Sequence, residues 1–559
     1  MSISSTIKSI QDIMRKDDGI DGDAQRIGQL VWMLFLKVFD QREEEWESDA
    51  VDRGETYQSV VPENCRWRNW ASFDAEGNPK ISGNEILDFV NNTLFPTLKE
   101  LPVENNSKAK VVREVFRDAY NYMKTGSLLL AIVQKLEESI NVYDFKERQH
   151  LGDIYEQILK DLQSAGNAGE FYTPRAVTQF IVNRANPRLG EKILDPACGT
   201  GGFLTATIDH LNKQLDDSAT SDDYVGMQNA IHGFEKKQLP HLLCTTNMLL
   251  HGIDVPSQIE HKNTLAKSWN DWSFHDQVDV IITNPPFGGM EDDGIGSSFP
   301  TALKTRETAD MFLTLIIKKL LKANGRAALV LPDGFLFGEG IKNKIKELLL
   351  TECNLHTIVR LPNGVFNPYT GIKTNLLFFT KGKPTETIWF YEHPYPEGVK
   401  NYNKTKPMRF AEFQTEMDWW GDEADGFNAR VETEQAWKIN FAELKADAET
   451  RAKPHWDKAE ELKKQISALN IQLKDTSKGE EQTALKQQVE LLTTQAKEQQ
   501  QAGDAIFNAI FNLDCKNPHQ VEQFSHDPEE LLSQYNQQQQ EIEALRESLK
   551  TILNNALSN

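Results

Sequence analysis

The sequence predicts an α/β protein in which a doubly wound, largely parallel sheet is flanked by helices on both sides along the chain. Between about residues 150 and 425, short apolar segments alternate with helical ones, as in doubly wound folds. The residues before this range, and those after about 430, instead show apolar side chains at helical spacing. We therefore expect three domains in the 559-residue chain: an N-terminal helical domain at 1–150, the α/β domain at 151–425 and a C-terminal helical region at 426–559.

Four short apolar segments in the middle domain are expected to be buried strands. They lie at 192–194, 278–283, 327–331 and 375–379. Short runs of β-branched and aliphatic residues are typical of strands that are covered on both faces. The apolar segment Met311–Leu321 is expected to be a helix between two of them, with Asn324-Gly325 as its stop signal.

The N-terminal domain is expected to be helical, because apolar residues recur there at helical spacing before an acidic run at 43–45. These residues are Ile27, Leu30, Val31, Leu34 and Val38. The domain shows no catalytic constellation. A scaffold is its simplest role, and an assembly surface is an alternative.

Two apolar stripes in the C-terminal domain predict an antiparallel helical hairpin. One stripe is Leu462, Ile466, Leu469 and Leu473, and the other is Leu485, Val489, Leu492 and Ala496. The turn-forming residues 475–479 separate them. A last helix is expected to carry Ile542, Leu545, Leu549 and Ile552. Two paired helices cover such stripes only in part, so a further helix from a partner is expected to pack on them.

Composition and charge exclude several classes of protein. The 61 basic and 83 acidic residues give a net charge of −22, so a nucleic-acid ligand would require a local basic patch or another subunit. The five scattered cysteines form no C-x-x-C pair, which argues against a disulfide framework and a structural zinc site, and no metal is expected. Neither a signal peptide nor a membrane-spanning run is found, so we expect a cytoplasmic protein without a membrane partner.

The most informative motif is Asn284-Pro285-Pro286-Phe287, at the end of the expected strand 278–283. Prolines stiffen the backbone and lack N–H donors, so nearby carbonyl oxygens face the cavity as acceptors. The side-chain oxygen of Asn284 and the carbonyl of Pro285 would then both accept hydrogens from one exocyclic amine, which prepares its nitrogen to attack an electrophile. Phe287 offers a flat face to a base. The alternative is an ordinary turn with a packing phenylalanine.

A glycine-rich loop follows the expected strand 192–194 and forms a candidate cofactor site. Its candidate contacts are Asp195, Gly199, Thr200, Gly201 and Gly202. Glycines let the backbone pass close to a ligand at a turn from strand to helix. The last glycine of the dinucleotide pattern is missing, and the preceding Asp-Pro-Ala-Cys favours S-adenosylmethionine over NAD. Asp195 would hold the positively charged amino group of the methionine.

Three further groups of residues are candidate cofactor contacts. Glu235, at a plausible second strand end, is expected to accept both ribose hydroxyls, and Asn263 is expected to contact the adenine ring. A lid over the methionine end is expected from Glu170, Phe171, Tyr172, Thr173, Pro174 and Arg175. A solvated acid is the alternative for Glu235, and simple packing is the alternative for the lid.

Together these motifs resemble the modification (M) subunit of type I restriction–modification systems, an amino-methyltransferase that acts on adenine N6 in DNA. The resemblance covers about residues 145–380 and is carried by five stretches. They are Gly169–Arg175, Asp195–Phe203, Asn247–Gly252, Asn284–Gly288, and Leu361–Phe366 taken with Thr374–Phe379. It implies that the α/β domain is a Rossmann-like, S-adenosylmethionine-dependent methyltransferase.

The resemblance also implies a reaction. A methyl group would pass from S-adenosylmethionine to a flipped-out adenine within double-stranded DNA. Asn284 and Pro285 would orient the amine of that adenine. Phe287 would stack on the base, and Phe366 would close its other face.

The implied partners are other subunits and DNA. A DNA-specificity (S) subunit would read the recognised sequence, and a second copy of this chain would join the complex. The chain has no G-x-x-x-x-G-K-[ST] phosphate loop, so the ATP-driven motor would belong to a restriction/translocase (R) subunit. In such a complex the N-terminal helices are candidates for a clamp on DNA.

Two other functions remain open at this point. Similar tetrads occur in enzymes that methylate guanine N2 in RNA, cytosine N4 or a glutamine amide, so an RNA or protein amine methyltransferase is the first alternative. The second is a non-catalytic scaffold that retains the fold. The intact Asp195, Asn284 and Phe287 argue against this scaffold.

Overall fold

The computed structural model describes residues 3–139, 155, 172–216, 218–367, 369–403, 406–475 and 479–519, and the single residues 539, 542 and 546. The chain divides into two compact units, Met1–Cys515 and Lys516–Asn559, and the account below concerns the first. Several predictions fall outside the described residues. They concern Glu170 and Phe171 of the expected lid, the boundary at 150, and Leu545, Leu549 and Ile552 of the expected last helix.

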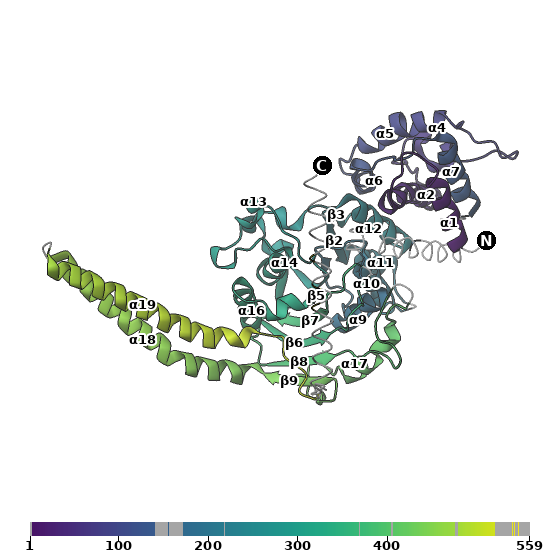
Figure 1. Cartoon of the computed structure of the whole chain (residues 1–559). Coiled ribbons are helices and arrows are strands. Elements are labelled where there is room, and N and C mark those ends of the chain that lie inside the picture. Colours follow the sequence, from purple (N-terminus) through teal and green to yellow (C-terminus); the bar gives the residue numbers. More distant parts are fainter. Residues whose placement is uncertain are drawn as a thin grey trace. The chain divides into compact units, whose positions relative to one another are not determined.

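A nine-stranded mixed sheet forms the centre of the described part of this unit, with the order β3-β2-β1-β4-β5-β7-β6-β8-β9 (Figure 1). The strands are β1 Ile193–Asp195, β2 Ile231–Glu235, β3 Ile259–His261, β4 Val278–Thr283, β5 Leu321–Pro332, β6 Cys353–Arg360, β7 Thr374–Lys381, β8 Thr387–Glu392 and β9 Ala436–Asn440. Only β7 and β9 run antiparallel to the rest of the sheet. The strand order reverses between β1 and β4, which is where ligands bind in doubly wound folds.

Helices cover both faces of the sheet, because successive strand residues point to opposite sides. Val280 and Ile282 of β4 lie in one apolar core with α9, α10 and α12, whereas Ile281 lies in a second core with α14 and α16. The helices of this domain are α9 Arg175–Ala185, α10 Gly202–Asn212, α11 Ser221–Ala230, α12 Gln238–Leu250, α13 Asp293–Gly296, α14 Thr308–Leu315, α15 Asp333–Phe337, α16 Ile341–Glu352 and α17 Gln414–Trp419. All four expected strands are present, as β1, β4, β5 and β7, and the predicted fold class is confirmed.

The helix expected over Met311–Leu321 ends earlier than predicted. Helix α14 continues as a π-helical turn over Ile316–Leu320, and β5 begins at Leu321. The predicted stop signal Asn324-Gly325 is therefore wrong as a helix end and lies inside β5. Asn324 has a φ of +62°, and a Cβ on Gly325 would approach the Asp279 carbonyl oxygen to 3.0 Å. The pair marks an irregular turn within the strand, close to a register shift in its pairing with β4.

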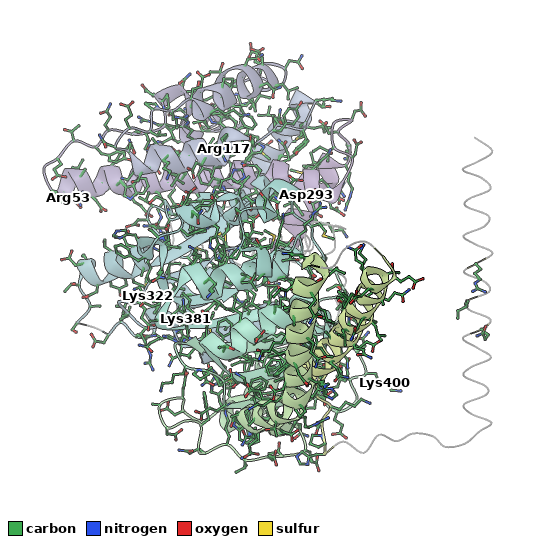
Figure 2. The ribbon with its side chains drawn as sticks, turned by 90° about the vertical axis from the view of Figure 1, so that its left-hand side faces the viewer. Arg53, Arg117, Asp293, Lys322, Lys381 and Lys400 are labelled. Atoms are coloured by element: carbon green, nitrogen blue, oxygen red, sulfur yellow. The ribbon has the colours of Figure 1, made fainter. Side chains whose placement is uncertain are left out.

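Two lysines tie the amino end of β5 to its neighbours. Lys322 forms an ion pair with Asp279 at 2.8 Å, and Lys381 of β7 donates a hydrogen bond to the Leu321 carbonyl at 3.0 Å. Figure 2 labels both lysines, Lys322 and Lys381. These contacts fix the start of β5 although its first residues continue directly from a helix.

The N-terminal region is helical, as predicted. Its longer helices are α1 Ile3–Met14, α2 Asp23–Asp52, α6 Ser107–Arg117 and α7 Gly126–Ser139, and its shorter ones are α3 Trp67–Trp70, α4 Glu85–Asp88 and α5 Phe95–Lys99. The five apolar residues singled out in α2 are all buried. The apolar core of this region includes Leu242, Leu243 and Leu249 of α12, so the helical region packs on a helix that covers the sheet.

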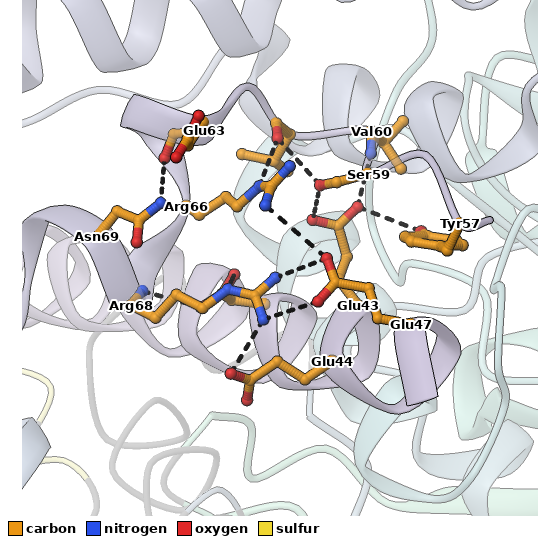
Figure 3. Close-up of polar contacts among 12 residues, drawn as sticks. Glu43, Glu44, Glu47, Tyr57, Ser59, Val60, Glu63, Arg66, Arg68 and Asn69 are labelled. Carbon is orange, nitrogen blue, oxygen red and sulfur yellow. Dashed lines mark hydrogen bonds and ion pairs between the residues drawn. The ribbon is translucent and has the colours of Figure 1, made fainter. Parts of the chain in front are cut away.

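A buried carboxylate of α2, that of Glu43, holds the segment that follows α2 against α2 itself (Figure 3). Glu43 is fully buried and accepts hydrogen bonds from the Tyr57 hydroxyl at 3.3 Å, the Ser59 hydroxyl at 2.5 Å and the Val60 N–H at 2.7 Å. A buried carboxylate is stable only when such donors replace water. Beside it, Arg68 forms ion pairs with three acidic residues of α2. They are Asp40, Glu44 and Glu47.

The predicted hairpin is formed by α18, Phe441–Asp475, and α19, Glu480–Asn508, which lie side by side in Figure 1. Leu462 and Ala496 are buried between the helices, and the other residues of the two stripes are half-buried. Nearer the sheet, a Cβ on Gly503 would come within 2.6 Å of the Trp456 ring, so the two helices are in close contact there. No helix within the described ranges is both long and apolar enough to cross a membrane.

We predict that Glu43→Ala loosens the segment 54–66 without unfolding the sheet. The substitution leaves three donors without their acceptor, which costs about 2 kcal/mol and speeds exchange of the local amides about thirtyfold. Hydrogen exchange followed by mass spectrometry measures this effect. Glu55→Ala is the matched control, because the Glu55 side chain makes an exposed ion pair with Arg53 and no other polar contact among the described residues. Equal exchange in the two variants would contradict the structural role of Glu43.

Candidate active site

A cavity of about 230 Å³ opens at the carboxyl edge of the sheet, where the strand order reverses. It brings together most of the described residues that the sequence analysis indicated as catalytic or cofactor-binding. They are Thr173, Asp195, Gly199, Thr200, Gly202, Glu235, Asn284, Pro285, Pro286 and Phe287. The glycine loop and the Asn-Pro-Pro-Phe tetrad are about ninety residues apart in sequence, and they meet because β1 and β4 are adjacent and parallel.

The glycine loop forms one wall of the cavity. Gly199 and Gly201 have backbone φ values of +53° and +83°, which residues other than glycine rarely adopt. A Cβ on Gly201 would also approach the Cys244 sulfur to 2.8 Å. From α12, the Asn247 side-chain amide donates to the Thr200 carbonyl at 3.1 Å. The loop is therefore held in a shape that leaves its backbone close to the cavity, and α10 begins directly after it at Gly202.

Asp195 places a buried carboxyl group at the end of β1. Its Oδ1 accepts a hydrogen bond from the Ala197 N–H at 3.1 Å, and its Oδ2 is buried. Burial raises the pKa of this carboxyl to about 7 and the nearby Glu235 carboxylate adds to the rise, whereas the Thr283 hydroxyl and the Ala197 N–H oppose it. A buried carboxylate that keeps accepting capacity on its second oxygen is suited to a cationic ligand such as an ammonium group.

Glu235 ends β2 on the other side of the loop. Its Oε1 accepts from the Lys237 N–H at 2.7 Å and its Oε2 from the Gly199 N–H at 3.0 Å. Burial raises the pKa of Glu235, and these backbone donors oppose the rise. Each carboxylate oxygen retains a further lone pair, so the group can accept two hydroxyl hydrogens at once.

Asn284 is held at the end of β4 with its amide orientation fixed. Its Nδ2 donates to the Thr173 hydroxyl at 3.0 Å. Its Oδ1 is buried and finds no hydrogen-bond partner in the part of the chain that is described. An amide oxygen buried in this state is costly unless a ligand donates to it. Pro285 and Pro286 line the same cavity and, as prolines, contribute no N–H donors to it.

Six described residues of the predicted site do not line this cavity: Gly201, Asn263, Phe366 and the lid residues Tyr172, Pro174 and Arg175. Asn263 accepts from the Leu265 N–H at 3.0 Å and donates to Glu291 at 3.4 Å. Its polar atoms are thus engaged in a turn and in contact with Glu291, which does line the cavity. Phe366 is 3% exposed and lies in the apolar core against which Phe287 packs. Their predicted roles remain predictions.

The expected lid is only partly described. Thr173 reaches the main cavity, whereas Tyr172 and Arg175 line a smaller neighbouring cavity together with Thr200 and Gly202. Arg175 lies 3.8 Å from Asp209 of α10. Pro174 immediately precedes the first residue of α9. The segment therefore approaches the cavity from the side of α9 and α10.

Seven residues that line the cavity lie outside the motifs found in the sequence. They are Lys236, Lys237, Gly289, Met290, Glu291, Thr308 and Tyr369. Five of them directly follow or lie close to a predicted site residue, so extension of each motif by a few residues would have found them. Lys236 and Glu291 form an ion pair at 2.9 Å across the cavity wall. Within the described ranges, no group of His, Cys, Asp and Glu side chains is placed to hold a metal ion.

Comparison with known protein families gives two matches. Residues 146–465 match the N-6 DNA Methylase family, and residues 3–136 match the HsdM N-terminal domain. The chain is 56% identical over 560 residues to the EcoEI methylase subunit of a type I restriction enzyme from Escherichia coli, covering 100% of this chain and 99% of that one. It is 30% identical to the StySPI methylase subunit from Salmonella potsdam, over 76% of this chain and 77% of that one.

Solved structures are similar as well. A modification subunit assigned to a type I restriction enzyme of Vibrio vulnificus YJ016 shares 42% identity, with a TM-score of 0.69 over 79% of this chain and 92% of that chain. A chain from a study of complex assembly and conformational transition in a type I R-M system shares 29% identity, with a TM-score of 0.70 over 99% and 98% of the two chains.

We predict that Asp195→Asn removes a pH dependence of stability from the ligand-free protein. The pKa of Asp195 is higher in the folded protein than in the unfolded chain, so its contribution to stability is lost as pH rises from about 4 to about 7, by up to about 4 kcal/mol. The thermal midpoint of Asp195→Asn should therefore exceed that of the wild type by a margin that grows up to about pH 7 and then stays constant. A constant margin from pH 4 to 8 would show that Asp195 does not titrate in this way.

Proposed function

The chain belongs to the N-6 DNA methylase family, as a modification subunit of the type I restriction enzymes, and we propose how its cavity carries out the reaction. Members of this family are adenine-specific DNA methyltransferases. In the proposal, the cavity binds S-adenosylmethionine against the glycine loop and receives an adenine that has left the DNA stack. The observation that carries the proposal is the buried Asn284 Oδ1, which has no hydrogen-bond partner among the described residues and lines the same cavity as Asp195.

The residues around the glycine loop fit S-adenosylmethionine. Asp195 holds the amino group of the methionine through its buried Oδ2, and Glu235 accepts hydrogens from the ribose hydroxyls. The backbone of Thr200 approaches the ligand closely because no side chain extends from the flanking glycines. When bound, S-adenosylmethionine supplies an electrophilic methyl group.

The tetrad orients the acceptor. The Asn284 Oδ1 and the Pro285 carbonyl accept hydrogens from the adenine amine, and the Thr173 hydroxyl fixes the amide of Asn284 in the required orientation. This withdraws the lone pair of the amine nitrogen from the ring and directs it toward the methyl group. Phe287 stacks on the extruded base. No strong general base is required, since the nitrogen loses its proton to water after attack, so catalysis is mainly alignment.

We predict that Asn284→Ala lowers methylation of duplex DNA by at least about a thousandfold and leaves S-adenosylmethionine affinity within about threefold of the wild type. Gly201→Val should instead lose S-adenosylmethionine affinity, and with it activity. Its side chain would meet Cys244 and displace the glycine loop. Calorimetry gives the affinity. Transfer of a labelled methyl group to DNA, RNA and protein acceptors gives the activity and its substrate class.

Two results would contradict this assignment. In Asn284→Ala, a loss of cofactor affinity in step with activity would move Asn284 to the cofactor site. Methyl transfer to RNA or protein in preference to DNA would support the alternative amine methyltransferases. Phe287→Leu is a useful companion variant, because it keeps an apolar side chain and removes the aromatic face.

The C-terminal hairpin is the proposed docking surface for a specificity subunit. Its distal stripe residues are half-buried by each other, and Ile471 and Leu491 are 64% and 59% exposed. A third helix would cover this apolar surface. A chain with a net charge of −22 is a poor DNA binder alone, so a docked specificity subunit would supply most of the contacts to DNA phosphates. In the proposed complex, two copies of this chain join one specificity subunit, and a restriction/translocase subunit joins the assembly.

We predict that replacing residues 465–495 by a short Gly-Ser turn abolishes co-purification with the specificity subunit. The variant keeps the Trp456–Gly503 contact, so the base of the hairpin and the sheet remain folded. Its S-adenosylmethionine affinity should be unchanged, while DNA methylation falls to background. If the shortened chain still co-purifies with the partner and methylates DNA at the full rate, the hairpin is self-contained and the docking role is wrong.

A further inference from the structure

The loop that joins β6 to β7 presents an exposed apolar side chain beside the catalytic cavity. Strands β5 and β6 both run antiparallel to β7, so this loop, residues 361–373, leaves β6 at the carboxyl edge that carries the cavity. Tyr369 of the loop lines the cavity. Three residues later, the side chain of Ile372 is 56% exposed. An aliphatic side chain in this position forgoes the free energy that burial would give it.

The exposure of Ile372 does not come from an unanchored backbone. The Leu361 N–H donates to the Thr374 carbonyl at 3.0 Å, which closes the base of the loop. The Asp333 N–H donates to the Lys373 carbonyl, also at 3.0 Å, directly after Ile372. Ile372 is thus an exposed side chain on a fixed backbone, three residues from Tyr369 and at the sheet edge that carries the cavity.

A duplex that delivers a base to the cavity has to lie across this edge. Extrusion of the base leaves a gap in the stack, and proteins that open a DNA stack commonly insert an apolar side chain into it. We propose that Ile372 enters the gap that the extruded adenine leaves and so stabilises the flipped state. Lys373, also exposed, lies next to it and provides positive charge for the flanking phosphates. This inference rests on the proposed function.

Phe337 is the competing candidate. It ends α15, whose first residue contacts the loop through the Asp333–Lys373 hydrogen bond, and it is 53% exposed. No residue of α15 is among the described residues that line the cavity. Ile372 instead shares its loop with Tyr369, which does line it. Met290 is also exposed, at 72%, but it lines the cavity itself and so faces the extruded base. The geometry therefore favours Ile372 as the side chain that fills the gap.

The test uses the chain co-purified with its specificity subunit and a duplex that carries an abasic spacer at the target position. This duplex presents the gap without a base for the cavity, so its affinity reports gap filling independently of Asn284 and of methyl transfer. Ile372→Ala should bind it about tenfold more weakly than the wild type, and Ile372→Leu should bind it as the wild type does. Val431→Ala is the matched control, because Val431 is also exposed, at 63%, on a loop before β9.

Methylation of the intact duplex gives the second readout. Ile372→Ala should lower kcat/KM about tenfold and reduce the fluorescence gain of 2-aminopurine at the target position, while S-adenosylmethionine affinity stays unchanged. The inference is overturned if Ile372→Ala binds the abasic duplex as tightly as the wild type, or if Phe337→Ala alone shows the loss. A wild-type level of abasic binding in Asn284→Ala, together with lost methylation, separates the two proposals.

Discussion

Two buried polar groups, the Asp195 carboxyl and the Asn284 amide oxygen, are the constraint around which this site is built. Burial is costly for both, and the Asn284 oxygen has no hydrogen-bond partner among the described residues to offset that cost. They lie at the ends of β1 and β4, which are adjacent and parallel at the point where the strand order reverses. In the proposed function, the Asp195 carboxylate holds the cationic methyl donor and the Asn284 oxygen accepts an amine hydrogen of the acceptor, so the two groups would place donor and acceptor in contact.

The surrounding structure keeps these two groups fixed. β4 is buried between two apolar cores, one on each face of the sheet. A shift of β4 by one residue would turn Ile281 to the opposite face, and Val280 and Ile282 to the face that Ile281 now occupies. The glycine loop is tied from behind by Asn247, and Asn284 is tied by Thr173. The proposed catalysis by alignment requires this rigidity, because it uses little acid–base chemistry that could compensate for misplaced groups.

Much of this site could be predicted from sequence because its motifs follow directly from strand ends. The apolar run at 278–283 predicts β4 to the residue, and the prolines after it line the cavity at the end of that strand. Asn263 and Phe366 were harder, because a strand-end position does not tell whether a side chain turns into the cavity, into its own turn or into the core. The end of α14 was misplaced because tertiary pairing of Leu321 with Val278 overrides the local Asn-Gly signal. That Tyr369 lines the cavity could not be predicted from sequence, because it depends on the three-dimensional path of the loop between β6 and β7.

The most direct test of the account is the affinity for S-adenosylmethionine measured by calorimetry between pH 5.5 and 8. Because burial raises the pKa of Asp195 to about 7, the carboxyl has to release its proton before it can hold the cationic amino group. The account predicts that wild-type affinity falls up to about tenfold for each pH unit below 7, that binding there releases a proton to the buffer, and that Asp195→Asn loses this dependence. A wild-type affinity that is constant over this range, with no proton release, would contradict the placement of the cofactor at Asp195.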